Sequence, residues 1–164
     1  MKSTSAGLLL YRRERGELEV LLAHPGGPFW RNHDAGAWTL PKGEGADGEP
    51  PESTALREFG EEIGPAPPGV PVPLGGIRQR GGKWVEAFAL EGDFDVTRLR
   101  SNLFELEWPP GSGKRRSFPE IDRAAWFTLD EAREKIRDTQ AELLDRLVTR
   151  LSGAPGATAR NERA

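Results

Sequence analysis

The chain has no cysteine and only two histidines among its 164 residues. The lack of cysteine excludes disulfide bonds, thiolate zinc sites and cysteine nucleophiles, so a metal site would have to be built mainly from carboxylates. No apolar run approaches the roughly 18 residues that cross a membrane. The N-terminal segment MKSTSAGLLLYRRERGE reaches charged residues too early for a signal peptide. We therefore expect a cytoplasmic protein that has no membrane partner.

A strong charge of either sign is also missing. The 23 basic and 26 acidic side chains leave a net charge of −3, which offers little attraction to nucleic acid or to an anionic membrane. We do not expect a nucleic-acid partner, and an anionic ligand must be held by local groups. The length suits one domain, which we place at residues 1–151, followed by a tail, residues 152–164, that we expect to be disordered. The oligomeric state is left open.

Apolar periodicity predicts an α/β domain. Apolar, β-rich runs bounded by glycine and proline predict strands at 4–12, 18–23, 37–40, 74–79, 84–90, 104–108 and 124–128. The first two strands are expected to form a hairpin, and so are the fourth and the fifth. Apolar residues at helical spacing predict helices at 52–63, 129–136 and 139–151. The segment 111–116 is interpreted as a basic loop.

The helix expected at 52–63 has two distinct faces. Its apolar residues share one side, namely Ala55, Leu56, Phe59 and Ile63. Glu58, Glu61 and Glu62 lie apart from them, and each like-charged pair costs a few tenths of a kcal/mol on an isolated helix. A divalent cation would offset this repulsion, and oxygen ligands suit magnesium or manganese better than zinc. The alternative is a solvated acidic face, as on many surface helices.

The stretch from Gly43 to Pro65, GEGADGEPPESTALREFGEEIGP, resembles the Nudix box. That signature runs glycine, five residues, glutamate, seven residues, Arg-Glu, an aliphatic residue, any residue, Glu-Glu, any residue, glycine and an aliphatic residue. Every charged and glycine position matches, whereas Phe59 and Pro65 replace the two aliphatic residues. The resemblance implies an α/β/α sandwich with a mixed β-sheet and a loop-helix-loop catalytic motif. It also implies that Arg57 and Glu49 form an ion pair that fixes the loop against the helix.

The resemblance further implies a hydrolase that cleaves a nucleoside diphosphate linked to another moiety. By analogy with the family, Glu58, Glu61 and Glu62 would coordinate magnesium, with manganese as a substitute. A backbone carbonyl in the Gly43 region would be a further ligand. Clustered divalent metal ions neutralise pyrophosphate charge and lower the pKa of bound water, which agrees with this chemistry.

Three segments favour one branch of the family. HPGGPFW (24–30), GAWTLPKGE (36–44) and EWPPGSGK…FPEIDRAAWF (107–127) are similar to the bacterial branch related to diadenosine polyphosphate hydrolases. They favour a dinucleoside polyphosphate such as diadenosine tetraphosphate as the substrate. A tyrosine downstream of the box often accompanies that activity, but the only tyrosine here is Tyr11. The alternatives are a nucleoside triphosphate or nucleotide-sugar pyrophosphatase and a non-catalytic nucleotide-sensing module.

Attack of water on phosphorus requires a general base. The family resemblance leaves open which glutamate serves, so Glu58 and Glu61 of the box are candidates. A second carboxylate from a later strand or loop is common in the family, and Glu107 is our first choice there. Glu105 is the next, because strict alternation places both on the same face of the strand expected at 104–108. The alternative is that both simply face solvent.

Several other side chains are candidates for binding the substrate. Lys42 directly precedes the glycine of the box, where its ammonium can reach a phosphate. Lys114 and Arg116 follow a glycine-rich turn and can clamp phosphates. The alternative for these three cations is a solvated surface. Phe29 and Trp30 share a loop and can stack on a nucleobase, with packing in the core as the alternative.

Overall fold

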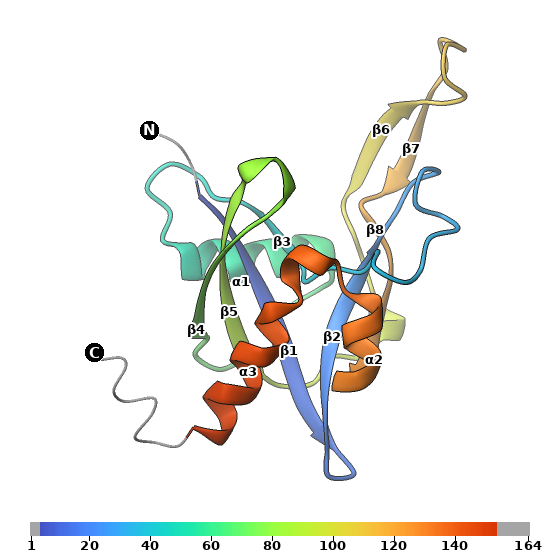
Figure 1. Cartoon of the computed structure of the whole chain (residues 1–164). Coiled ribbons are helices and arrows are strands. Elements are labelled where there is room, and N and C mark those ends of the chain that lie inside the picture. The colour runs from blue at the N-terminus through green and yellow to red at the C-terminus, as the bar shows by residue number, and fades with distance from the viewer. Residues whose placement is uncertain (1–3, 154–164) are drawn as a thin grey trace.

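The computed structural model describes residues 4–153. A six-stranded mixed sheet lies between helices, and a separate two-stranded hairpin projects beyond it (Figure 1). The strands are β1 (Ser5–Glu14), β2 (Glu17–Pro25), β3 (Lys42–Glu44), β4 (Val72–Arg78), β5 (Trp84–Glu91), β6 (Leu103–Glu107), β7 (Arg115–Pro119) and β8 (Ile121–Thr128). The helices are α1 (Pro51–Glu62), α2 (Leu129–Lys135) and α3 (Glu142–Ser152), and short 3₁₀ turns are η1 (Arg80–Gly82), η2 (Val96–Arg98) and η3 (Asp138–Gln140).

Strand β1 lies in the middle of the sheet, whose order is β4-β5-β1-β2-β8 with β3 also paired to β1. It is parallel to β5 and antiparallel to β2 and β3. Leu8, Leu9 and Leu10 have no exposed surface. Because successive strand residues point to opposite faces, this leucine run requires apolar cover on both sides of the sheet.

The helices supply that cover on the two faces. Leu8 and Leu10 pack in a core cluster with Ala55 and Phe59 of α1. Leu9 packs in a second cluster with the buried residues of α2 and α3. The expected α/β/α sandwich with a mixed sheet is therefore confirmed. The helix expected at 52–63 and its buried apolar face are also found.

A segment between β2 and α1 separates the two strands of the first hairpin. The backbone N–H and C=O of Ala23 exchange hydrogen bonds with Thr39, and the backbone N–H of Leu8 donates to the carbonyl of Pro41. Strand β3 pairs with residues 5–7 of β1, whereas β2 pairs with residues 11–14 on the same edge of β1. The segment thus fills the space between the diverging strands. This insertion places Lys42 and its glycine neighbour beside α1, where the two elements are in contact.

The structure corrects several expected boundaries. The strand expected at 37–40 is reduced to isolated bridges, because Pro41 has no N–H to continue a ladder. The basic loop expected at 111–116 is shorter, since β7 already begins at Arg115. The last helix starts as a 3₁₀ turn, and α3 extends to Ser152. The tail expected to be disordered began at residue 152, but Ser152 belongs to α3; the remainder of that expectation, residues 154–164, lies outside the described residues. Within residues 4–153, no helix is both long and apolar enough to cross a membrane.

Removal of the Phe59 ring tests the packing of α1 on the sheet. Phe59 is completely buried, so Phe59→Ala should lower the free energy of unfolding by about 3–5 kcal/mol through lost burial and a residual cavity. Urea denaturation at neutral pH measures this difference. Phe29→Ala is the matched control, because Phe29 is 61% exposed and its loss should cost much less. Equal effects of the two substitutions would contradict the packing described.

Candidate active site

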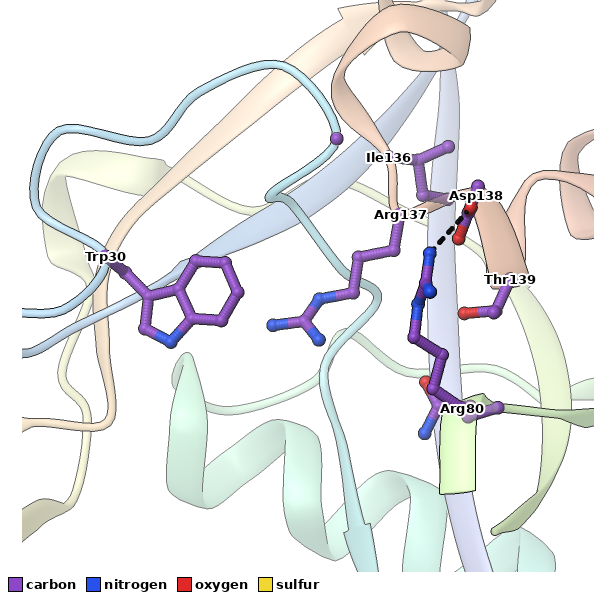
Figure 2. A pocket seen from close by; sticks show the side chains of 8 residues that line it. Trp30, Arg80, Ile136, Arg137, Asp138 and Thr139 are labelled. Atoms are coloured by element: carbon purple, nitrogen blue, oxygen red, sulfur yellow. Dashed lines mark hydrogen bonds and ion pairs between the residues drawn. The ribbon is translucent and has the colours of Figure 1, made fainter. Parts of the chain in front are cut away.

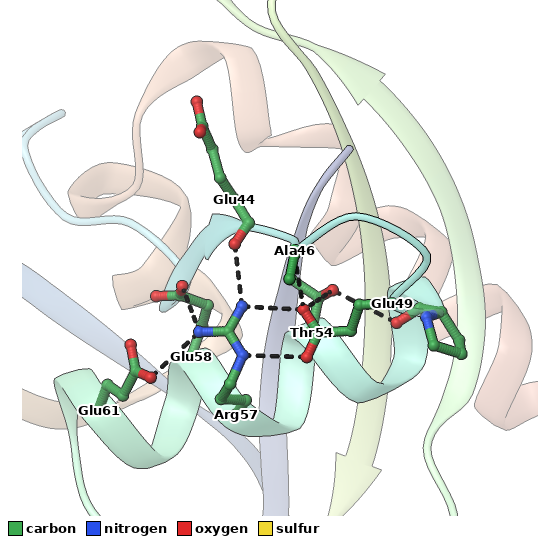
Figure 3. A network of polar contacts seen from close by, with 8 residues as sticks. Glu44, Ala46, Glu49, Thr54, Arg57, Glu58 and Glu61 are labelled. Carbon is green, nitrogen blue, oxygen red and sulfur yellow. Dashed lines mark hydrogen bonds and ion pairs between the residues drawn. The ribbon is translucent and has the colours of Figure 1, made fainter. Parts of the chain in front are cut away.

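Arg57 of α1 is the centre of a polar network that joins the helix to the loop before it (Figure 3). Its Nε and Nη2 donate to the two carboxylate oxygens of Glu49 at 3.0 and 2.9 Å. Its Nη1 donates to Glu58 at 3.0 Å and to Glu61 at 3.1 Å. Nη2 also donates to the backbone carbonyl of Glu44 at 3.0 Å. A guanidinium has five N–H groups in a fixed plane, so this network uses its full donor capacity.

Glu49 is held by the loop as well as by the helix. Its Oε1 accepts hydrogen bonds from the backbone N–H of Ala46 at 3.0 Å and from the hydroxyl of Thr54 at 2.9 Å. The hydrogen bonds from Arg57, from Ala46 and from Thr54 lower the pKa of Glu49 to about 2. The ion pair expected between Arg57 and Glu49 is confirmed, and it fixes the loop against α1.

Gly43 and Glu58 are in close contact. A Cβ atom on Gly43 would lie 2.1 Å from the carboxyl carbon of Glu58, so only glycine leaves room for that carboxylate beside the backbone. Burial, and then the charge of Glu61, raises the pKa of Glu58 against the opposing effect of Arg57. The structure therefore forms a cradle in which the Glu58 carboxylate faces the loop backbone.

Glu62 is the most strongly perturbed carboxylate of the helix. Burial, followed by the charges of Glu58 and Glu120, raises the pKa of Glu62 to about 8. The nearby ammonium of Lys42 acts in the opposite direction but does not outweigh burial. Burial also lowers the pKa of Lys42 itself. Carboxyl groups are thus gathered here in a partly desolvated environment, where one lysine does not offset the cost of ionising Glu62.

Glu120 is a further carboxylate at this site that no sequence pattern indicated. Its backbone N–H donates to the carbonyl of Asn102 at 2.8 Å, and the N–H of Asn102 donates to the carbonyl of Glu61 at 3.0 Å. Burial and then the charge of Glu61 raise the pKa of Glu120. We call Glu58, Glu61, Glu62 and Glu120 the acidic cluster. No periodic pattern marked Glu120, because it occupies the single position between β7 and β8.

Glu107 does not join the acidic cluster. Strand β6 starts next to Asn102 and runs for five residues, so at about 3.3 Å per residue Glu107 lies roughly 16 Å further along the chain. The hairpin of β6 and β7 extends away from the main sheet (Figure 1). Glu107 accepts a hydrogen bond from the N–H of Gly113 at 2.7 Å, and Glu105 pairs with Arg115 at 3.2 Å. These contacts stabilise the hairpin and do not link either glutamate to the acidic cluster.

The two remaining cations expected to bind the substrate lie on the same hairpin. Lys114 is in the loop, where its backbone N–H donates to the hydroxyl of Ser112. Arg116 lies over the ring of Phe118, with 5.9 Å between the guanidinium carbon and the ring centroid. Both are exposed, and the structure brings neither one into contact with the described residues of the acidic cluster. Lys42 is the predicted cation that lies beside it.

The neighbouring aromatic residues of the 26–36 loop have different surroundings. Phe29 is 61% exposed and packs edge-on against Trp108 of the hairpin region, with 5.4 Å between the ring centroids. Trp30 is partly buried and lines a cavity (Figure 2). The guanidinium carbon of Arg137 lies 4.7 Å from the centroid of the Trp30 ring. Of these two rings, only that of Trp30 lines a cavity.

The donor set of the acidic cluster fits a hard divalent cation. Within residues 4–153, no three carboxylate or imidazole side chains converge on one point, since Arg57 holds Glu58 and Glu61 toward itself. The Glu58 carboxylate nevertheless lies directly against the backbone at Gly43. Oxygen ligands with excess negative charge are typical of magnesium and manganese sites. A bound cation would share two of the carboxylates with the guanidinium.

Comparison with known proteins identifies the domain. A family model described as the NUDIX domain matches residues 1–147. No curated protein is similar enough to match the chain.

Solved structures share the fold at low sequence identity. A Caenorhabditis elegans Ap4A hydrolase in a binary complex is 23% identical with a TM-score of 0.65, over 92% of this chain and 100% of that one. The NUDIX domain of Shewanella oneidensis NrtR, complexed with ADP ribose, is 18% identical with a TM-score of 0.64, over 92% and 89%. The Nudix hydrolase RenU from Mycobacterium smegmatis is 22% identical with a TM-score of 0.56, over 91% and 86%.

The buried charge of Glu62 should make the metal-free protein less stable at alkaline pH. Between the ordinary pKa of 4.5 and the folded value of about 8, the unfolded chain loses a proton that the folded chain retains. The unfolded state then binds fewer protons, so stability falls as the pH rises through this window. Glu58 and Glu120 act in the same direction. Glu62→Gln should flatten the profile.

Thermal unfolding in EDTA from pH 5 to pH 9 measures the effect. Glu52→Gln is the matched control, because Glu52 is an exposed residue in the first turn of the same helix. The control should follow the wild-type profile. A wild-type melting temperature that rises across this range, or an equal effect of both substitutions, would contradict the assigned burial of Glu62.

Proposed function

The chain belongs to the Nudix family of hydrolases, and from this premise we propose that it is a magnesium-dependent pyrophosphohydrolase. Its substrate would be a nucleoside diphosphate linked to another moiety. The observation that carries the proposal is the acidic cluster, which gathers partly desolvated carboxylates beside the glycine cradle and Lys42. Such a concentration of negative charge is unfavourable by itself and is suited to a cation that in turn binds phosphates.

Each residue of the box has a distinct part in this proposal. Glu58, Glu61 and Glu62, with the backbone carbonyl of Gly43, would hold the ion. When bound, magnesium polarises a phosphoryl oxygen, lowers the pKa of coordinated water and neutralises developing charge. Arg57 keeps the loop and two of the carboxylates in a fixed relation through its hydrogen bonds. Manganese offers the same ligand preferences.

We assign the role of general base to Glu120 in place of Glu107. Its carboxylate reaches solvent and stands at the acidic cluster. Burial and the charge of Glu61 raise the pKa of Glu120, which strengthens it as a proton acceptor near neutral pH. Glu58 and Glu61 are the other candidates, but each already accepts a hydrogen bond from Nη1 of Arg57. Glu120 has no such partner among the described residues.

Substrate contacts divide between Lys42 and the aromatic loop. Lys42 would place its ammonium on a phosphate next to the ion. Trp30 would contact the nucleobase, because it faces a cavity. Phe29, Lys114 and Arg116 would act only on substrate parts that reach the hairpin.

We favour a dinucleoside polyphosphate, such as diadenosine tetraphosphate, as the substrate. The supporting observations are the segments 24–30, 36–44 and 107–127 and the similarity of the fold to the C. elegans Ap4A hydrolase. The lack of a tyrosine after the box speaks for nucleoside triphosphates or nucleotide sugars instead. Nucleotide sensing without catalysis is the second candidate function, and the similarity to the NrtR domain bound to ADP ribose favours it.

A hydrolysis screen with magnesium separates these functions. The substrates are diadenosine polyphosphates, nucleoside triphosphates, ADP-ribose, nucleotide sugars and triphosphorylated RNA, with products identified by chromatography. We expect diadenosine tetraphosphate to be cleaved fastest, to ATP and AMP. Preference for another diphosphate would retain the chemistry and refute the subclass. Nucleotide binding without any turnover would overturn the proposed activity in favour of sensing.

Loss of a metal-binding carboxylate should abolish most of the activity. Glu61→Gln and Glu62→Gln should each lower kcat by about a hundredfold or more, because several kcal/mol of metal-supplied stabilisation are lost. Circular dichroism should show an intact fold. Glu52→Gln, on the same helix but away from the acidic cluster, should retain near-normal turnover. Near-normal turnover in both cluster variants would refute the metal-site assignment.

The two candidate bases are distinguished by one pair of variants. Glu120→Gln should lower kcat by roughly 10²–10⁴-fold, the usual contribution of a general base. Glu107→Gln should change kcat little, since its carboxylate only caps the hairpin loop. Steady-state kinetics at saturating magnesium measures both. The opposite ranking would return the role to Glu107.

A further inference from the structure

Arg137 lies beside a cavity and has no anionic partner in the described part of the chain. The cavity has a volume of about 480 Å³ and lies between the Trp30 loop, the end of β4 and the segment that joins α2 to α3 (Figure 2). At its rim, Arg80 pairs with Asp138 at 2.9 Å. Arg137 has no such ion pair within residues 4–153, and its Nε is buried without a hydrogen-bond partner there. The charge of Arg80 is therefore balanced by a carboxylate, whereas that of Arg137 is not balanced within residues 4–153.

The environment of Arg137 is unfavourable for a cation. Burial alone lowers the pKa of Arg137, with no neighbouring carboxylate to oppose it. The ring of Trp30 at 4.7 Å offers a cation–π contact, but this is weaker than a charge-assisted hydrogen bond. A partly desolvated guanidinium with an unused donor stabilises an incoming anion strongly, because much of its dehydration has already occurred.

The walls of the cavity are held in place by the fold. The backbone N–H of Arg137 donates to the carbonyl of Trp38 at 2.9 Å. The Gln140 side chain joins the backbone N–H of Leu40 at 3.0 Å to Gln79 at 2.9 Å. On the opposite side, the buried His24 ring lies 2.6 Å from the carbonyl of His33 and so anchors the loop of Trp30.

The charges of the acidic cluster and of Arg137 both influence Lys42. The charge of Arg137 and the charges of Glu58 and Glu62 all act on the Lys42 ammonium, in opposite directions. Lys42 therefore lies within electrostatic range of both sites.

We propose that Arg137 and Trp30 form a nucleotide subsite, in which Arg137 donates hydrogen bonds to a phosphate and Trp30 contacts the nucleobase. The cavity volume lies within the range of small-molecule sites. An aromatic ring next to a guanidinium suits a nucleotide, because a nucleotide joins a planar base to an anionic phosphate. This inference rests on the proposed function for the class of its ligand, a nucleotide, but its test does not require turnover.

Equilibrium binding of AMP and of adenosine in EDTA tests the subsite. Without divalent cations, the acidic cluster repels phosphate and does not contribute to binding. Calorimetry should show that the wild-type protein binds AMP about tenfold or more tightly than adenosine, through the charge-assisted hydrogen bonds of Arg137. Arg137→Gln should abolish this preference, and Arg137→Lys should retain part of it. Trp30→Leu should lower the affinity for both AMP and adenosine.

Arg133→Gln is the matched control. Arg133 lies on the adjacent helix α2 and pairs with Asp145 at the surface at 2.8 Å, so its removal should leave the preference for AMP unchanged. Inorganic phosphate supplies a test that needs no variant. It should compete with AMP for the wild-type protein and leave adenosine binding unaffected.

The proposal is overturned if Arg137→Gln binds AMP within twofold of wild type, if the wild-type protein does not prefer AMP to adenosine, or if phosphate does not compete. These outcomes are distinct from failure of the proposed function. AMP binding that depends on Arg137, together with no hydrolysis in the screen, would support the subsite and overturn the enzyme. Hydrolysis in the screen, together with AMP binding that does not depend on Arg137, would support the enzyme and overturn the subsite.

Discussion

The five hydrogen bonds of the Arg57 guanidinium are the constraint on which the rest of the site depends. They join the Glu49 loop, the backbone at Glu44 and two carboxylates of α1 in one plane. Because a guanidinium is rigid and its donors diverge, it sets the distance between loop and helix. The same group offsets part of the repulsion between Glu58 and Glu61, and so it permits carboxylates to gather where a cation can bind.

The sheet brings the remaining groups to this network. The two strands of the first hairpin diverge, and the segment between them pairs with both, as the hydrogen bonds of Ala23 and Leu8 show. Lys42 and Gly43 therefore enter the domain between strands and reach the side of α1. The absence of a Cβ on Gly43 then allows the Glu58 carboxylate to rest against the loop backbone. The pairing of this segment with the two strands thus decides where Lys42 and Gly43 lie relative to α1.

Charge is distributed unevenly along the resulting surface. The acidic cluster gathers carboxylates at one site, Arg137 has no ion pair within residues 4–153 at the cavity, and the charges of both act on Lys42. A ligand that contains both a cation and an anionic chain can bind the acidic cluster through the cation and Arg137 through the anion. A metal-bound polyphosphate has this composition, which gives one physical reason for the whole arrangement.

The spacing of apolar residues along 52–63 predicted the two faces of α1, because that pattern is local to one helix. The resemblance of residues 43–65 to the Nudix box implied the sandwich fold and the Arg57–Glu49 ion pair, and the structure contains both. The sequence did not determine where separate elements meet. The alternation in 104–108 correctly placed Glu105 and Glu107 on one strand face, yet only the tertiary structure showed that this strand leaves the main sheet. Glu120 and Arg137 came to the site through backbone pairing with distant segments, and such pairing depends on strand register and hairpin direction, which local periodicity does not encode.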